Sequence, residues 1–180
     1  MLFKSVLAAM ISIVSAAMPA VPGDHSQSRL AEAEQRILAA HNGERNRVGA
    51  QALEWDAALA ASAASYGPTL ESLGRLVHSP RAGRPGQREN LWMGSRGAYS
   101  PEHMVGSWIA ERTLLRPGTY PAVSATGRWE DVSHYTQMVW PTTTRVGCAV
   151  HSSATTDFLI CRYSPPGNRD GMVIPLAWLR

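Results

Sequence analysis

The sequence predicts an α+β fold in which helices come first and an antiparallel sheet follows. Apolar residues recur at helical spacing in the first two thirds of the chain, whereas the last third holds short runs rich in β-branched and aromatic residues. Helices that precede strands, rather than alternate with them, favour a layered α+β domain over a parallel βαβ sheet. The 180 residues suffice for one domain with a single sizeable core.

Three helical segments are expected. The first covers residues 30–48, where apolar side chains return every three or four positions. The second begins after Asp56, a good N-cap, and its alanine-rich face ends or kinks near residues 67–68. The third covers residues 100–115 and starts with a serine N-cap, a proline and a glutamate, which suit the first turn of a helix.

Three strands are expected in the last third, over residues 135–140, 145–150 and 157–163, with short connections. Residues 78–97 are rich in Gly, Pro and Arg and predict a long loop, a kind of segment that often carries function. Residues 116–129 show no periodicity and predict a second loop.

The N-terminus is typical of a secretory signal. Lys4 supplies a positive charge before an apolar run over residues 5–17, which ends in small residues. We expect cleavage after Ala17, with Ala20 as the second choice. The alternative is a retained anchor, but the run is shorter than the about 20 residues that cross a bilayer. The protein is therefore expected to be secreted, into the medium or the periplasm, with no transmembrane span after cleavage.

The expected division is a signal peptide over residues 1–17, a flexible leader over 18–27 and one domain over 28–180. The formal net charge is +3, and no run of Lys and Arg interleaves with aromatic residues. This composition argues against nucleic acid as a partner. A monomer is expected.

The chain contains only two cysteines, Cys148 and Cys161. An even number in an exported chain favours one disulfide, and two buried free thiols are the alternative. The two cysteines lie on strands that a simple hairpin would join through residues 152–156. In the register that sets the two cysteines opposite each other, Gly147 faces Arg162.

Several short strings of polar and aromatic residues occur along the chain, and their order identifies a family better than most of the strings do singly. The most specific is His134-Tyr135-Thr136-Gln137-Met138-Val139-Trp140. The others are His41-Asn42-Gly43-Glu44-Arg45, His78-Ser79, Glu89-Asn90-Leu91, Trp108-Ile109-Ala110-Glu111, Val146-Gly147-Cys148-Ala149 and Cys161-Arg162-Tyr163-Ser164-Pro165-Pro166-Gly167-Asn168. Over about residues 35–168 the chain resembles the CAP superfamily of cysteine-rich secretory proteins, antigen 5 and group-one pathogenesis-related proteins. The resemblance implies an SCP-like domain, a three-layer α-β-α sandwich with a central antiparallel sheet.

The resemblance also assigns a role to His41, which with Asn42 stands where the family has a buried polar pair that braces the core. We expect a structural rather than a catalytic role for it. The chain departs from the family at Ser133 and at Gln87-Arg88, where glycine is more common.

A cleft follows from the same resemblance, in which His78, Glu89, Glu111 and His134 converge. Neutral imidazole is a good zinc ligand, and a carboxylate can orient its second ring nitrogen. His78 and His134 are the expected metal ligands. Because tight zinc sites have three or four protein ligands, we expect weak binding of zinc or another divalent ion, and a site that also exists without metal.

Three functions remain open at this point. The favoured one is a non-enzymatic binding module that holds a metal ion, a lipid or sterol, or a partner at the cell surface. The second is a peptidase-like, metal-dependent hydrolase in which Glu89 or Glu111 activates water; it lacks a firm third ligand. The third is a structural scaffold whose loops bind another protein.

Overall fold

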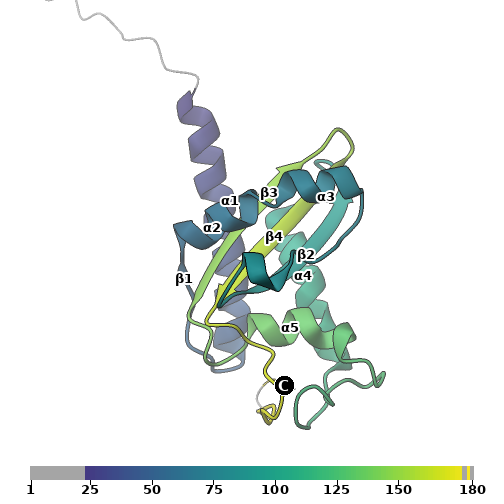
Figure 1. Ribbon diagram of the computed structural model, residues 1–180. Coiled ribbons are helices and arrows are strands. Elements are labelled where there is room, and N and C mark those ends of the chain that lie inside the picture. The colour runs from purple at the N-terminus through teal and green to yellow at the C-terminus, as the bar shows by residue number, and fades with distance from the viewer. Residues whose placement is uncertain (1–22, 176–177, 179–180) are drawn as a thin grey trace, which may run out of the picture.

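A computed structural model of the chain describes residues 23–175 and Trp178 (Figure 1). The expected signal peptide over residues 1–17 lies outside this part of the chain. Residues 23–27, which were expected to belong to the leader, form the start of helix α1 (Gly23–Arg47). Over the described residues, no helix combines the length and apolar character that crossing a membrane demands.

A four-stranded sheet forms the middle of the domain, in the order β1-β3-β4-β2. Its strands are β1 (Glu54–Trp55), β2 (Arg88–Ser95), β3 (Arg145–Ser152) and β4 (Thr156–Ser164). Strand β4 pairs antiparallel with both β3 and β2. The predicted antiparallel sheet is therefore confirmed, with one addition: the two-residue β1 runs parallel to β3.

Helices cover both faces of the sheet, which confirms the α-β-α sandwich (Figure 1). On one face lie α2 (Ala57–Ala64) and α3 (Gly67–Leu73), and on the other lie α1, α4 (Pro101–Ala110) and α5 (Ser133–Met138). The smaller apolar cluster, under α2 and α3, consists of Ala63, Leu70, Leu91, Phe158 and Ile160. The larger cluster lies on the other face and includes Ile37, Val105, Trp108, Tyr135, Leu159 and Tyr163.

Local capping explains where two helices begin. The Asp56 carboxylate accepts hydrogen bonds from the backbone N–H groups of Ala58 and Leu59 at 2.9 and 3.0 Å. The Ser100 hydroxyl accepts one from the backbone N–H of His103. Both predicted N-caps are confirmed, because each side chain satisfies N–H groups that lack partners inside the first turn.

The strand predicted over residues 135–140 is wrong, because residues 133–138 form helix α5. The segment is buried on all sides, so its side chains show no period that separates a strand from a helix. What decides the conformation is Glu111, whose carboxylate accepts hydrogen bonds from the first-turn N–H groups of His134 and Tyr135, both at 3.0 Å.

The loop predicted over residues 78–97 is also partly wrong, because residues 88–95 form strand β2 at the edge of the sheet. Polar residues at buried positions, Glu89 and Asn90, hide the apolar character that marks a strand. Their burial is possible because each has hydrogen-bond or ion-pair partners on neighbouring elements.

The predicted hairpin register is confirmed: Cys148 pairs with Cys161 and Gly147 with Arg162. A disulfide joins the two cysteines. Gly147 lies where α2 crosses β3, and a Cβ atom there would be 2.3 Å from the Ala60 nitrogen and from the Asp56 oxygen. Only glycine lets the helix approach the strand this closely.

Candidate functional site

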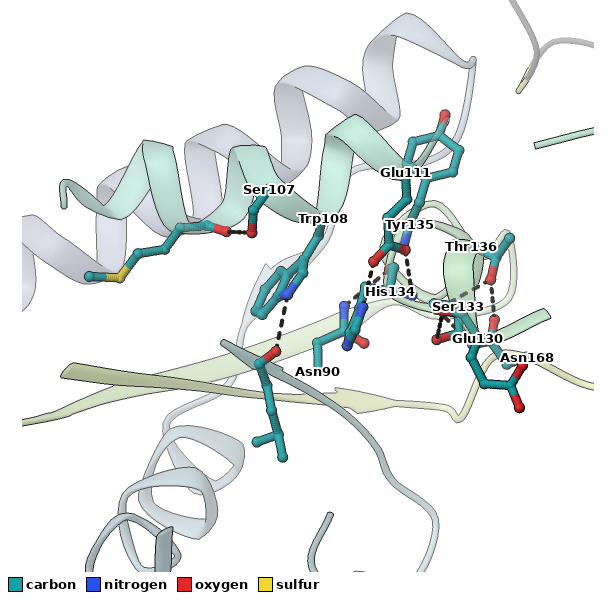
Figure 2. Close-up of polar contacts among 12 residues, drawn as sticks. Asn90, Ser107, Trp108, Glu111, Glu130, Ser133, His134, Tyr135, Thr136 and Asn168 are labelled. Carbon is teal, nitrogen blue, oxygen red and sulfur yellow. Dashed lines mark hydrogen bonds and ion pairs between the residues drawn. The ribbon is translucent and has the colours of Figure 1, made fainter. Parts of the chain in front are cut away.

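A cleft of about 680 Å³ lies at one end of the sheet. His78, from the segment between α3 and β2, lines it together with Glu89 on β2 and His134 on α5. Glu111 follows α4 and contacts His134, but it is not among the residues that line the cleft (Figure 2). Three of the four predicted residues therefore line one cleft, and the fourth, Glu111, contacts the cleft residue His134.

The first half of the site is the pair of His78 and Glu89. The Glu89 carboxylate is fully buried, and its Oε1 accepts from His78 Nδ1 at 2.7 Å and from the Ser79 backbone at 3.0 Å. Its Oε2 accepts from the Ser79 hydroxyl and lies 3.1 Å from Arg162 Nη2. Burial alone would raise the pKa of Glu89, but the His78 hydrogen bond and the Arg162 charge outweigh it and lower that pKa below its ordinary value. The carboxylate is therefore ionised at neutral pH.

The second half is the pair of His134 and Glu111 (Figure 2). His134 Nδ1 donates to Glu111 Oε1 at 2.6 Å, while Oε2 accepts from the backbone N–H groups of His134 and Tyr135. The ring of Trp108 stacks on the His134 imidazole, with a centroid distance of 5.9 Å and an interplanar angle of 16°. One carboxylate therefore sets both the start of α5 and the orientation of its histidine.

The two halves share one chemical pattern. Because an ionised carboxylate only accepts, Nδ1 of each neutral imidazole carries the proton and Nε2 keeps its lone pair. All four carboxylate oxygens of Glu89 and Glu111 already accept at least one hydrogen bond or ion pair. Both glutamates act as orienting groups, and neither presents an unengaged oxygen that would favour activation of a water.

For a metal in this cleft, the imidazoles of His78 and His134 would be the donors. Over residues 23–175, no group of three or more His, Cys, Asp or Glu side chains is arranged to hold a metal ion. Two oriented imidazoles fit a divalent cation that takes its remaining ligands from water, and such a site binds weakly.

Behind the cleft, a chain of hydrogen bonds braces His134 from the main core. Asn90 Nδ2 donates to the His134 carbonyl at 3.0 Å and to the Tyr163 hydroxyl at 3.2 Å. The hydroxyl donates to His41 Nε2 at 2.8 Å, since His41 Nδ1 donates to the Ile37 carbonyl. His41 is buried and has a structural role here, and Tyr163 is a residue that sequence reasoning did not single out.

The two departures from the family pattern are accommodated without glycine. Ser133 has φ −72° and ψ −31°, which any L residue adopts. Within the described part of the chain, Asn168 is the one non-glycine residue with positive φ, so Gln87 and Arg88 also have ordinary backbones.

Two further features of the surface escaped sequence reasoning. Four arginines line the cleft: Arg81, Arg84, Arg88 and Arg169. A separate apolar groove of about 430 Å³ lies between α1 and α2, beside β3. It is lined mainly by aliphatic residues of these elements, including Leu30, Ala33, Ile37, Ala57, Ala60, Ala61, Ala64 and Val150. Neither feature forms a contiguous pattern in the sequence.

Comparisons with known proteins agree with the fold and with the residue strings. The family model described as "Cysteine-rich secretory protein family" (CAP) matches residues 38–163. The chain is 38% identical over 138 residues to the pathogenesis-related protein PR-1 type of Sambucus nigra, covering 76% of this chain and 78% of that protein. It is 36% identical over 144 residues to pathogenesis-related protein 1A of Nicotiana tabacum, covering 79% and 81%. Among solved structures, "Crystal structure of NaASP2 with Zn2+" matches with a TM-score of 0.66 at 24% identity, covering 79% of this chain and 84% of that one.

Proposed function

Because the chain belongs to the cysteine-rich secretory protein (CAP) family, we propose that it is an exported binding module, not an enzyme, whose cleft weakly holds a divalent cation such as Zn²⁺ through His78 and His134. One observation carries the proposal. Each imidazole has its Nδ1 held by a carboxylate, and both histidines line the same cleft, so the cleft contains two imidazoles whose Nε2 lone pairs remain for a ligand.

The carboxylates bonded to the two imidazoles favour a cation at this position, although four arginines line the same cleft. Glu89 and Glu111 each place a carboxylate on the Nδ1 side of one imidazole, which orients the ring and supplies negative charge to compensate a positive ion. Arg162 neutralises part of this charge at Glu89, and only two protein ligands are available. Both facts favour weak, reversible binding over a permanent structural metal.

Zinc titrated into the metal-free protein is expected to bind at pH ~7.5 and to bind at least about tenfold more weakly at pH ~5.5, since protons compete for the imidazole lone pairs. His78→Ala and His134→Ala should each weaken binding by at least about tenfold. Isothermal titration calorimetry measures both effects. His103→Ala is the matched control, because His103 is an exposed histidine that does not line the cleft. Unchanged affinity in the His78→Ala/His134→Ala double variant would remove the proposed site.

A second candidate function is the binding of a lipid or sterol, and the apolar groove between α1 and α2 favours it. The groove is lined mainly by aliphatic side chains, together with Trp55 and Cys148, and Glu34 is its one charged residue among the described ones. Burial of a hydrocarbon chain against such a surface is worth about 0.8 kcal/mol per CH₂ group.

Filling this groove is expected to weaken lipid binding without harm to the fold. Ala61→Trp places a large ring in the groove from the exposed side of α2, and Ala39→Trp places the same ring on an exposed site of α1 outside it. A fluorescent fatty acid should bind the wild type and Ala39→Trp alike, and bind Ala61→Trp at least about tenfold more weakly. Equal binding by all three proteins would contradict this candidate.

A further inference from the structure

The wall of the cleft next to the two imidazoles is rich in arginine. Arg81 and Arg84 come from the short 3-10 turn (Arg81–Gly83) and the residue after it, and Arg88 begins β2. Arg169 comes from the segment that follows β4. All four line the same space. Residues far apart in the chain therefore place four guanidinium groups around one cavity.

Within residues 23–175 and 178, none of these four arginines forms an ion pair with a carboxylate, although six other arginines do. Arg81 and Arg169 make no side-chain hydrogen bond in that part of the chain, and both are exposed. Arg84 and Arg88 donate only to neutral groups, which are the carbonyl and hydroxyl of Ser79 and the carbonyls of Gln87, Gly167 and Asn168.

The positive charges of this wall repel one another. Burial lowers the pKa of Arg88, and the neighbouring charges of Arg81 and Arg84 lower it further. Three carboxylates also line the cleft. Glu89 is engaged by His78 and Arg162, and the other two, Glu130 and Asp170, are exposed. The Asp170 charge acts on the Arg88 pKa in the opposite direction without offsetting the lowering. The four arginines therefore outnumber the two carboxylates, Glu130 and Asp170, that remain to compensate their charge.

A fifth guanidinium, that of Arg162, contacts the Glu89 carboxylate of this cleft. Arg162 is 3% exposed, and its Nε and Nη1 atoms have no hydrogen-bond partner in the described part of the chain. Glu89 is the carboxylate that it contacts, and Glu89 is shared with His78. Glu89 compensates the Arg162 charge, so the positive potential of the cleft comes from the four arginines that line it.

The geometry points to an oxyanion site on this wall: the cleft binds a ligand with a phosphate or sulfate group, which Arg81, Arg88 and Arg169 hold. Guanidinium groups suit this role because their planar N–H forks match tetrahedral oxyanions. A cavity of about 680 Å³ exceeds the space that a bare phosphate fills, and Trp129, 43% exposed, offers an apolar face in the same cleft. The ligand is therefore the ester of a small polar molecule. This inference names the ligand class of the cleft and rests on its proposed binding role.

Calorimetry with glucose 6-phosphate, inorganic phosphate and glucose tests the inference, in the presence of EDTA so that no metal contributes. Glucose 6-phosphate is expected to bind and glucose is not, with an affinity that falls as salt is added. Arg81→Gln/Arg169→Gln should weaken binding by about tenfold for each arginine. Arg75→Gln/Arg96→Gln removes the same charge from exposed sites outside the cleft and should change binding by less than about twofold.

The outcomes separate cleanly. Equal binding by the wild type and the cleft variant, or equal weakening in the two double variants, would overturn the inference. So would the absence of binding of both glucose 6-phosphate and inorganic phosphate by the wild type. Comparable affinity for inorganic phosphate would support the site and identify the free ion as its ligand, whereas tighter binding of glucose 6-phosphate would support the ester. If the protein binds phosphate but does not bind zinc, the proposed metal role is wrong and the oxyanion site is supported.

Discussion

Replacement of Arg45 by methionine is expected to destabilise the domain by about 3–5 kcal/mol, the range for loss of a buried charged group that leaves its partners unsatisfied. The Arg45 side chain is fully buried, and burial lowers its pKa to about 10, so the guanidinium remains charged at neutral pH. It donates to four carbonyl oxygens at 2.6 to 3.0 Å, those of Gln51, Met138, Trp140 and Thr143.

The same contacts connect Arg45 to the cleft. Two of the four carbonyls lie at the end of α5 and just after it, and α5 carries His134. Urea denaturation followed by tryptophan fluorescence measures the change in the free energy of unfolding. Arg29→Met is the matched control, because Arg29 lies on the same helix and is exposed. A loss below about 1 kcal/mol in Arg45→Met, or an equal loss in the control, would contradict the assigned role.

Acidification is expected to destabilise the protein through His41. Burial, with help from the charge of Arg45, lowers the pKa of His41 to about 4, although the Ile37 carbonyl acts in the opposite direction. Free imidazole has a pKa of about 6.5, so below that pH the unfolded chain takes up a proton that the folded protein does not. The contribution of His41 to the free energy of unfolding is therefore fully present above pH ~6.5. It is lost as the pH falls toward ~4, by about 3 kcal/mol in all.

The decisive window lies between pH ~6.5 and ~5, where about 2 kcal/mol should be lost and carboxylates contribute little. Urea denaturation at several pH values measures the slope of stability against pH. His41→Gln is less stable at neutral pH but lacks the titrating ring, so its slope should be much smaller in this window. His103→Gln, an exposed histidine, should keep the slope of the wild type. Equal slopes in the wild type and His41→Gln would show that His41 is not the group responsible.

Much of the fold could be predicted from the sequence because the relevant signals are local. The caps at Asp56 and Ser100 satisfy N–H groups two or three residues away. The hairpin that pairs Cys148 with Cys161 depends on a short connection between two alternating segments. In each case the residues that decide the conformation are neighbours in the chain, so a pattern read along the sequence contains them.

The candidate site was predictable only in part. Composition and periodicity did not select His78, Glu89, Glu111 or His134; the strings around them did, through their resemblance to a family. The arginines at positions 81, 84, 88 and 169 follow no such string, and their common location depends on how the segments before β2 and after β4 meet.

The sequence alone predicted the α+β class, the starts of the helices capped by Asp56 and Ser100, and the pairing of the two cysteines. That residues 133–138 form a helix and residues 88–95 a strand became clear only from the folded structure. The physical reason is the distance along the chain between the bonding partners. Glu111 accepts a hydrogen bond from the backbone of His134, which lies 23 residues later in the chain. Arg162 forms an ion pair with Glu89 on another strand of the sheet. Buried polar groups take the conformation that satisfies their hydrogen bonds, and those partners exist only once the chain has folded.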